Sequence, residues 1–514
     1  MKKSFQLLLI CIAAAAFAGC YADKGNYDYT EIGAFYIDTE GTTTNFTVSM
    51  FERLEISPKV VFEGGDANLT YLWKAYPTPT SSLISINIST EKNLSEIITI
   101  APQTYFLEFS ATDVNTGRKA TFRYDLRVEA TDAGMMVLYE RNGLTDFGLI
   151  TPTFIFGNAT QDKVSLDIYT STNPDYPLTG RPVGIGGNKT TQVEHITICT
   201  HNDIVRLSTL DYSITHYFSD LVLEPIPPAQ RNIVFYFCPQ AMTITANRDV
   251  SNGSEQFMNH NVLYNRANAT SSAHMYFNET IPNPPVALDL APFMAIDGLC
   301  YAYVFDRNSN RLMSSNTIGG AALQNLTQEP GVPIPDMDIV YMGRCAGGYG
   351  YAISIIFKGK GADENKRYFY IAEGIIPGPY LLKGDISAYT GIVQAELFTM
   401  AMQGPVAYYV ANNKIYQIRF NPIAGTVEDQ AVEAWPGAAG ETITAMEFLR
   451  HPGRNLGLTG LGILDKYLFV ATYNGTQGKV YVFEVNLQTD GSLVQTPVGV
   501  YSGFGKVKGF SFKY

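Results

Sequence analysis

The side chains that could do acid–base or metal chemistry are few and widely separated in this sequence. Six histidines occur, and only His195, His201 and His216 fall close together. We expect His195 and His201 to flank one β-hairpin, so a metal site would need facing strands to converge. Ordinary surface or core histidines are the favoured interpretation. The sequence therefore predicts no metal site, no cofactor and no identifiable catalytic residue.

Local catalytic motifs are missing as well. The chain contains no H-E-x-x-H, G-x-S-x-G or P-loop motif. Ser89-Thr-Glu-Lys92 matches the S-x-x-K pattern but lacks K-T-G and S-D-N companions, so we interpret it as a chance match. Acidic pairs of the glycosidase type are spatial relations that leave no local pattern. A hydrolase or lyase site assembled from several strands thus stays open as the alternative.

The clearest chemistry lies at Cys20. Two lysines at the start precede an apolar run that ends at Phe17. This run is shorter than the roughly 20 residues needed to span a bilayer, and it has the form of a secretory signal. The sequence Phe17-Ala-Gly-Cys20 matches a bacterial lipobox, in which the cysteine thiol takes a diacylglyceryl group. We predict lipidation at Cys20, with residues 1–19 as the signal peptide and 20–27 as a lipidated tether.

The other cysteines of the mature chain do not form a recognisable site. Cys199, Cys238, Cys300 and Cys345 are far apart and include no C-x-x-C pair, which argues against a zinc ribbon or a thioredoxin-type site. An exported protein can form disulfides. The sequence does not assign their pairing.

One aromatic residue is a candidate for ligand contact. Trp435 stands before Pro436 and Gly437, a pair typical of loops. Because aromatic rings in exposed loops bind sugars and peptides, we predict that Trp435 contacts a glycan or peptide ligand.

The charge of the chain excludes one class of partner. Lys and Arg number 36 against 48 Asp and Glu, for a formal net charge of -12. Removal of residues 1–19 takes away two lysines and no acid. Since an acidic surface repels phosphate backbones, we expect no nucleic-acid partner.

Residue patterns indicate β-structure throughout. The chain has 33 Tyr, 29 Phe and 45 Gly, and no long segment shows helical periodicity. In residues 28–131, two alternating runs flank Asn115-Thr-Gly117, which predicts a hairpin. Trp73 would fill the core between two sheets, as in an Ig-like sandwich. We assign 28–131 to such a domain.

Residues 133–514 repeat one theme at intervals of about 50 to 60 residues: an apolar strand, a tight polar turn, and a strand with alternating aromatic residues. The clearest copy reads Val406 to Ala411, Asn412-Asn413, then Lys414 to Phe420. Such hairpins are typical of the inner part of a β-propeller blade, and the length suits seven blades. Short helices near Gln324 and Met400 are also expected. A large irregular sandwich is the other architecture that fits.

The segment Cys20-Tyr-Ala-Asp-Lys-Gly-Asn-Tyr27 resembles the start of the PKD-like family lipoproteins of Bacteroidota. Tyr71-Leu-Trp73 and the hairpin from Phe106 to Val128 resemble strands of PKD-type sandwiches. The resemblance implies an outer-membrane lipoprotein, facing the cell surface or the periplasm. It also implies an accessory role beside a TonB-dependent transporter in nutrient uptake of the starch-utilisation type. It transfers no residue except Cys20.

These observations favour a non-catalytic binding protein of the cell envelope, held to the membrane by its lipid. The sandwich would act as a spacer and the propeller as the recognition surface. A propeller-based hydrolase or lyase acting on a glycan or peptide is the alternative.

Overall fold

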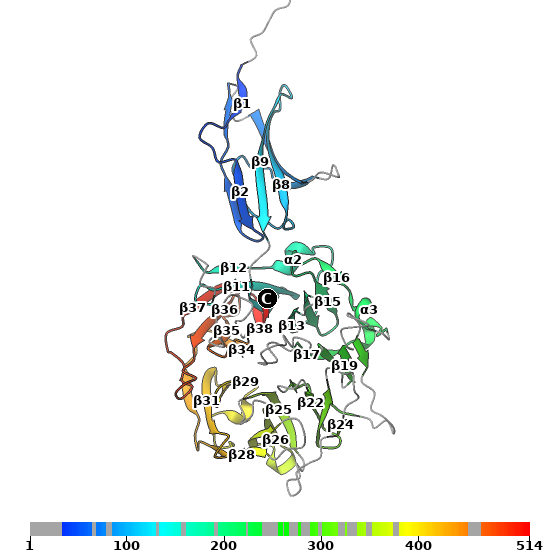
Figure 1. Cartoon of the computed structure of the whole chain (residues 1–514), viewed down its shortest axis with the longest axis vertical. Helices are drawn as coiled ribbons and strands as arrows, with labels where there is room; N and C mark the ends of the chain where they lie inside the picture. Colours follow the sequence, from blue (N-terminus) through cyan, green and yellow to red (C-terminus); the bar gives the residue numbers. More distant parts are fainter. Residues whose placement is uncertain are drawn as a thin grey trace, which may run out of the picture. The chain divides into compact units, whose positions relative to one another are not determined.

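The computed structural model describes residues 33–513, apart from 64–67, 79–84, 130–132, 156–160, 190–193, 223–224, 239–254, 261, 267–275, 279–287, 297–300, 317–323, 326–336, 346–351, 374–379 and 451–463. Cys20 and the tether lie outside these residues, so lipidation stays a prediction. Within the described part, no helix is both long and apolar enough to cross a membrane. The chain is nearly all-β and divides into two compact units (Figure 1).

The first unit comprises residues 1–46, 54–96 and 104–127, and it is an Ig-like sandwich. Its main sheet has five strands in the order β2-β9-β8-β5-β6, and two smaller sheets pair β1 with β4 and β3 with β7. The strands are β1 (Phe35–Asp38), β2 (Asn45–Ser49), β3 (Arg53–Ile56), β4 (Lys59–Phe62), β5 (Leu69–Pro77), β6 (Ile86–Ser89), β7 (Leu94–Ile97), β8 (Thr104–Asp113) and β9 (Lys119–Glu129).

The predicted hairpin and core residue of this unit are confirmed. β8 and β9 pair antiparallel around a turn in which Gly117 has a φ of 71°, a conformation that glycine adopts without strain. Trp73 is 0% exposed, and its ring lies 4.6 Å from that of Phe109 and 5.8 Å from that of Tyr124. The indole N–H donates to the Glu91 carbonyl at 2.9 Å, which satisfies its one polar atom.

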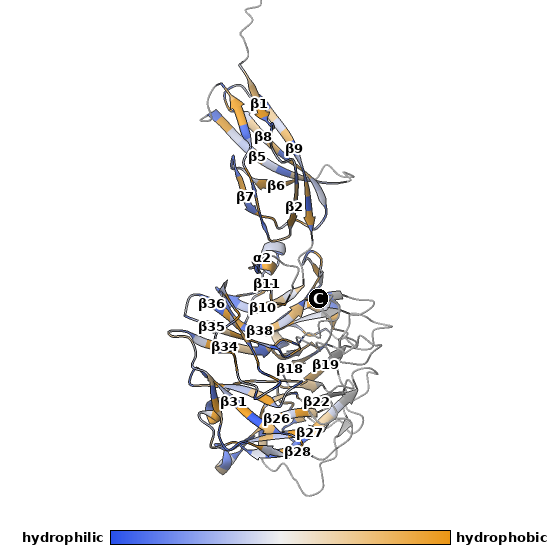
Figure 2. Cartoon of the chain, turned by 60° about the vertical axis from the view of Figure 1, so that its left-hand side comes forward, coloured by the Kyte–Doolittle hydropathy of each residue, from blue (hydrophilic) through white to orange (hydrophobic). Residues whose placement is uncertain are grey.

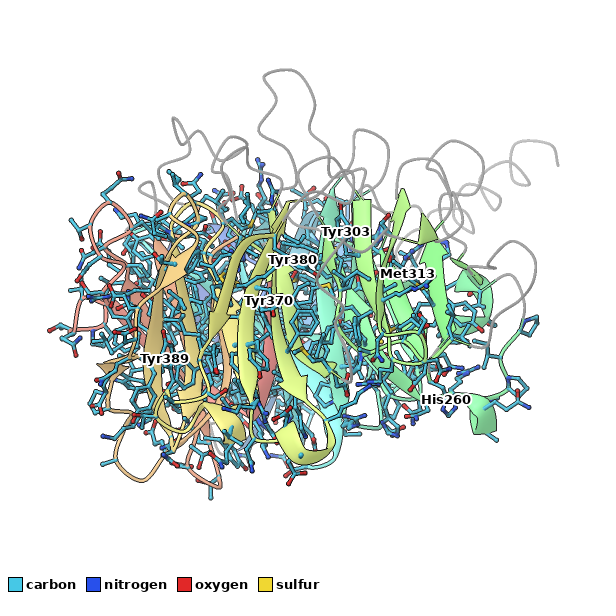
Figure 3. The ribbon with its side chains drawn as sticks, turned by 90° about the horizontal axis from the view of Figure 1, so that it is seen from below. His260, Tyr303, Met313, Tyr370, Tyr380 and Tyr389 are labelled. Carbon is cyan, nitrogen blue, oxygen red and sulfur yellow. The ribbon has the colours of Figure 1, made fainter. Side chains whose placement is uncertain are left out.

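The second unit comprises residues 47–53, 97–103 and 128–514, and it is a β-propeller. Seven antiparallel sheets, which we call blades 1 to 7, are described within it, in agreement with the predicted number. Apolar residues run along their strands in Figure 2. Figure 3 shows how rings from adjacent strands meet, as Tyr370 and Tyr380 do at 5.2 Å.

The blades are listed here from their innermost to their outermost strand. Blade 1 holds β38 (Lys506–Lys513), β10 (Gly134–Arg141), β11 (Leu144–Thr151) and β12 (Lys163–Ser165); blade 2 holds β13 (Pro182–Lys189), β14 (Glu194–Thr200), β15 (Ile204–Leu207) and β16 (Ile214–His216); blade 3 holds β17 (Ile233–Phe237), β18 (Gln256–Asn259), β19 (Val262–Arg266) and β20 (Tyr276–Asn278); blade 4 holds β21 (Ala295–Ile296), β22 (Tyr301–Asp306), β23 (Arg311–Asn316) and β24 (Gln324–Asn325).

Blade 5 holds β25 (Met337–Arg344), β26 (Ala352–Gly359), β27 (Arg367–Glu373) and β28 (Tyr380–Asp385); blade 6 holds β29 (Leu397–Met400), β30 (Val406–Ala411), β31 (Lys414–Asn421) and β32 (Thr426–Val427), with β33 (Val432–Trp435) also paired to β31; blade 7 holds β34 (Thr442–Phe448), β35 (Tyr467–Tyr473), β36 (Gly478–Glu484) and β37 (Gly499–Phe504). Two short helices, α2 (Ile168–Thr172) and α3 (Phe218–Leu221), follow β12 and β16.

The last strand closes the ring. β38 does not pair with the preceding β37. Instead β38 pairs antiparallel with β10 from Gly134↔Lys513 to Glu140↔Lys506, which makes the C-terminus the innermost strand of blade 1. It also contacts β13 and β34, the innermost strands of blades 2 and 7.

The repeated hairpins exist, but they occupy a different place in each blade from the one expected. Pairs such as β10–β11, β30–β31 and β35–β36 form the second and third strands, not the innermost ones. Their turns use the backbone expected of Asn and Gly, with positive φ at Asn142, Gly143, Asn412 and Asn413. The predicted helices near Gln324 and Met400 are wrong, because both residues lie in strands, β24 and β29.

Candidate functional site

A channel lies at the centre of the propeller, and we call it the central channel. Its cavity volume is about 380 Å³, and residues of all seven innermost strands line it. Ten of the 23 lining residues are methionine or aromatic: Phe235, Tyr236, Phe237, Phe293, Met294, Tyr341, Met342, Met402, Met446 and Phe510. Methionine side chains are flexible and polarisable, so such a lining adapts to apolar ligands of varied shape.

One side of the central channel carries a compensated charge cluster. The Arg450 guanidinium lies 2.7 Å from Asp465 Oδ1 and 3.1 Å from Glu447 Oε1, and it donates to the Met400 carbonyl at 2.5 Å. Burial would lower the pKa of Arg450, but the negative charges on Asp465 and Glu447 outweigh it and raise that pKa. The guanidinium therefore stays charged, and its charge is matched by its own neighbours.

Lys508 lines the central channel in a different way. Among the described residues it has no ion pair or hydrogen bond from its side chain. Burial against the wall, with the nearby positive charges of Lys506 and Arg181, lowers the pKa of Lys508; Glu140 and Glu396 act in the opposite direction. Lys508 is exposed to solvent, so an anionic ligand can reach this cation and supply the direct partner that it lacks.

The space beside Lys508 is open. A Cβ atom added at Gly509 would meet no atom within 4 Å, and the backbone of Gly509 does not have a positive φ. At Gly184 and Gly343, by contrast, an added Cβ would lie 2.8 Å and 2.2 Å from tyrosine side chains. Gly509 is thus a position where a larger side chain can fill the channel without distorting the strand.

A buried polar cluster lies behind the wall of the central channel; we call it the Glu255 network. Glu255 is 0% exposed and its carboxylate lies 2.7 Å from Arg206, 2.8 Å from the Tyr236 hydroxyl and 2.7 Å from the Thr197 hydroxyl. His195 Nε2 lies 3.1 Å away. Both oxygens of the Glu255 carboxylate already have partners, so Glu255 is not free to bind a ligand. The hydrogen bond that it accepts from the Tyr236 hydroxyl instead holds this tyrosine in the wall of the channel.

The three histidines that lie close together in the sequence have separate partners. His195 belongs to the Glu255 network, His201 Nδ1 accepts from the Arg181 backbone N–H at 3.1 Å, and His216 contacts Thr215. In the described ranges, no group of three or more His, Cys, Asp or Glu side chains is arranged to hold a metal ion.

The cysteines differ in their surroundings. Cys199 and Cys345 are buried, at 0% and 1% exposure, and Cys238 lines the central channel; each is a free thiol. Cys300 lies outside the described residues. Burial raises the pKa of Cys345 to about 12, which makes this thiol unreactive near neutral pH.

Trp435 was predicted to lie in an exposed loop, but the structure places it in a strand. It is the last residue of β33, is 8% exposed, and packs 5.1 Å from Phe483 and 5.3 Å from Tyr481. This packing belongs to the core between blades 6 and 7. A ligand contact by Trp435 stays a prediction without support from this packing.

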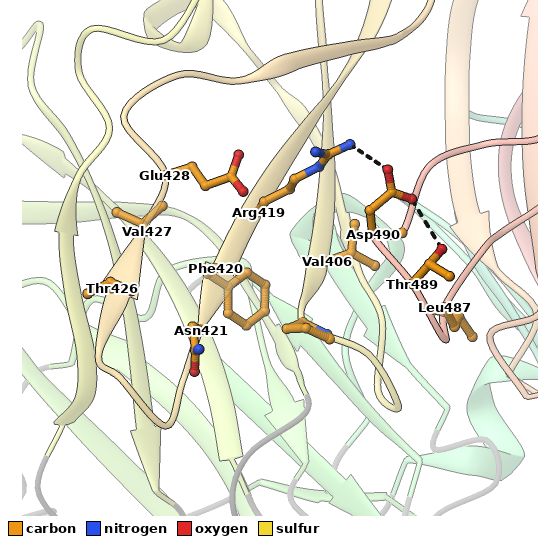
Figure 4. A pocket seen from close by; sticks show the side chains of 12 residues that line it. Val406, Arg419, Phe420, Asn421, Thr426, Val427, Glu428, Leu487, Thr489 and Asp490 are labelled. Atoms are coloured by element: carbon orange, nitrogen blue, oxygen red, sulfur yellow. Dashed lines mark hydrogen bonds and ion pairs between the residues drawn. The ribbon is translucent and has the colours of Figure 1, made fainter.

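A second cleft, also of about 380 Å³, lies between blades 6 and 7 (Figure 4). Arg419 faces Asp490 across it at 3.0 Å, and Phe420, Val406 and Leu487 lie among its other lining residues. Hydrogen bonds from the side chain and backbone of Ser492 lower the pKa of Asp490. Since its opposite charges pair with each other, this cleft is a weaker candidate than the central channel.

The profile of the PKD-like family matches residues 20–182. The N-terminal part of the chain is PKD-like. The matched range covers the sandwich and extends through β12 of blade 1 to the start of β13. No curated protein sequence matches the chain.

Three solved structures illustrate the structural likeness. A quinonprotein alcohol dehydrogenase-like protein from Bacteroides thetaiotaomicron has 12% identity and a TM-score of 0.44, with 93% of this chain and 99% of that chain covered. Apo AztD from Citrobacter koseri has 11% identity and a TM-score of 0.35, covering 86% and 98%. The Dos1 propeller has 9% identity and a TM-score of 0.34, covering 63% and 73%. At these values the likenesses carry no argument about function, and the propeller follows from the sheet topology itself.

Sequence reasoning favoured the propeller as the recognition surface but did not identify the residues of the central channel, because they come from all seven blades. Lys508, Met342 and Arg450 are separated by more than fifty residues each, and no spacing rule connects them. The last strand holds three lysines, Lys506, Lys508 and Lys513, so its sequence does not single out Lys508.

Proposed function

We propose that this chain is a non-catalytic binding protein of the cell envelope whose central channel is the recognition site. The single observation that carries the proposal is the cavity of about 380 Å³ lined by residues of all seven innermost strands, with ten methionine or aromatic residues in its lining. Cavities of this size and polarity are typical of sites that bury a small ligand.

The cellular setting is part of the proposal. Lipidation at Cys20 would hold the chain to the outer membrane, and the PKD-like match of residues 20–182 agrees with a lipoprotein of this kind. In that setting the propeller would serve as an accessory component of TonB-dependent nutrient uptake. The charged residues of the central channel, which are partly paired, support binding better than acid–base chemistry.

A dye titration tests the channel as a binding site. The mature chain with Cys20→Ala, which carries no lipid, is titrated with the neutral dye N-phenyl-1-naphthylamine. We expect saturable fluorescence enhancement, and at least tenfold weaker binding by Gly509→Phe, because the new ring fills the open space beside the strand. Equal affinity in the two chains would overturn the channel assignment. Circular dichroism shows whether the variant is folded.

A pull-down tests the uptake role separately. The tagged lipoprotein is purified from detergent-solubilised envelope, and recovery of a TonB-dependent transporter is expected. A chain that emerges as a free monomer under conditions that keep known transporter complexes intact would contradict the accessory role.

A further inference from the structure

The innermost strands share an irregularity that singles out Lys508. In β38, Gly509 pairs with Leu138 and Val507 pairs with Tyr139, so Lys508 is the extra residue of a β-bulge. Comparable register shifts interrupt β13, β17, β25 and β34. A bulge changes the direction of a side chain and is often found beside functional sites.

The extra residue of the bulge in blade 1 is of a different type from the extra residues in the other four blades. The extra residues in the other four strands are Val183, Val234, Val340 and Thr444. A small β-branched side chain is therefore sufficient to pack at a bulge in these four strands. Blade 1 instead places a lysine there, and this lysine lines the central channel.

The surroundings of Lys508 suit an anionic group on an otherwise apolar ligand. Phe510, two residues along the same strand, lines the channel, and open space lies in front of Gly509 between them. Within the described part of the chain, the ammonium group has no direct ion-pair partner. The other charged residues that line the channel are Arg344, Glu447 and Arg450; Arg450 pairs with Glu447, and Arg344 has a partner of its own. A carboxylate, sulfonate or phosphate would supply the missing counter-charge.

We propose that the central channel selects amphipathic organic anions, with an apolar body against the methionine and aromatic lining and the anionic group on Lys508. This inference rests on the proposed function, because it names the ligand class of the same channel. The inference goes beyond the proposed function because it assigns the selectivity for anions to one residue, Lys508.

Two dyes that differ by one sulfonate group test this selectivity. They are 8-anilinonaphthalene-1-sulfonate and the neutral N-phenyl-1-naphthylamine. Lys508→Val, which copies the residue of other blades, should weaken binding of the anionic dye at least fivefold and change that of the neutral dye by less than twofold. Lys508→Arg should retain the preference for the anion. The matched control Lys383→Gln, on the outermost strand of blade 5, makes a similar change in net charge and should alter neither.

Competition extends the test to an aliphatic ligand. Decanoate should displace the anionic dye from the wild-type chain at least fivefold more effectively than decanol, and this difference should disappear in Lys508→Val. Equal loss of both dyes in Lys508→Val, or an unchanged anion preference, would overturn the inference. The proposed function would survive that result if Gly509→Phe still blocks the neutral dye, so the two failures are distinguishable.

Discussion

Glu255 shows how one residue can carry a large share of local stability. A carboxylate with 0% exposure is stable only where its charge is compensated, and Arg206 lies 2.7 Å away. Glu255→Gln keeps the shape but leaves Arg206 facing a neutral group. We expect the free energy of unfolding of the propeller to fall by about 3 kcal/mol. Urea denaturation followed by Trp435 fluorescence in a Trp73→Phe background measures this, because the remaining tryptophan then reports the propeller.

The control for this prediction is an exposed ion pair. Glu484 and Lys466 lie 3.4 Å apart, with 39% of each side chain exposed. Surface pairs contribute about 0 to 1 kcal/mol, so Glu484→Gln should have a small effect. Comparable losses in the two variants would show that burial of Glu255 does not matter as argued.

Glu441 gives the propeller a pH dependence. Burial tends to raise its pKa, but hydrogen bonds from Lys479, Thr472 and Tyr481 outweigh burial and hold the pKa below its ordinary value of 4.5. A carboxyl whose pKa is lower in the folded chain stabilises the fold above its unfolded pKa, and this contribution disappears as pH falls through the folded pKa.

The pH prediction is tested by comparing two chains at two pH values. Between pH 7 and pH 3, the urea midpoint of the propeller should fall further in the wild-type chain than in Glu441→Gln, which lacks the titrating group. Parallel declines would mean that Glu441 contributes nothing to the acid sensitivity.

At the scale of the element, ring closure depends on β38. This strand provides the innermost position of blade 1 and contacts the innermost strands of both neighbouring blades. A chain that ends at Phe504 would leave β10 without its inner partner. We expect this truncated chain to lose the cooperative unfolding transition reported by Trp435. The sandwich, followed by Trp73 in a Trp435→Phe background, should unfold as before. A cooperative propeller transition in the truncated chain would contradict the closure role.

The elements that could be predicted are those specified by local residues. Asn142-Gly143 and Asn412-Asn413 predict turns because Asn and Gly accept a positive φ. The alternating apolar side chains of β9 predict a half-buried strand. The pairing of β38 with β10 joins residues more than 360 positions apart, and nothing local specifies it. The position of each hairpin within its blade was mistaken for a similar reason, since neighbouring blades decide it.

The candidate site follows the same rule. The partners of Glu255 come from β14, β15 and β17, and the channel combines seven strands, so no single segment carries the site. Trp435 was expected in a loop because Pro436 and Gly437 follow it. It is instead buried, since the turn begins one residue later and its ring packs against blade 7.

At the scale of the whole molecule, the chain combines a PKD-like sandwich with a seven-bladed propeller, and we propose a lipid anchor at Cys20. The anchor is tested by Cys20→Ala, which should move the chain from the membrane fraction to the soluble fraction, because acyl chains contribute about 0.8 kcal/mol for each buried CH₂ group. Fractionation followed by immunoblotting measures the shift. A variant that remains with the membrane after a high-salt wash would show that another feature holds the chain there.

Thiol footprinting can show whether ligands bind within the central channel. Cys238 lines the channel, whereas Cys199 and Cys345 are buried and serve as internal references. Alkylation by N-ethylmaleimide is followed at each cysteine by peptide mass spectrometry, with and without saturating N-phenyl-1-naphthylamine. We expect bound dye to slow alkylation of Cys238 several-fold. An unchanged rate at Cys238 while the dye is bound would place the binding site outside the central channel and contradict the proposed function.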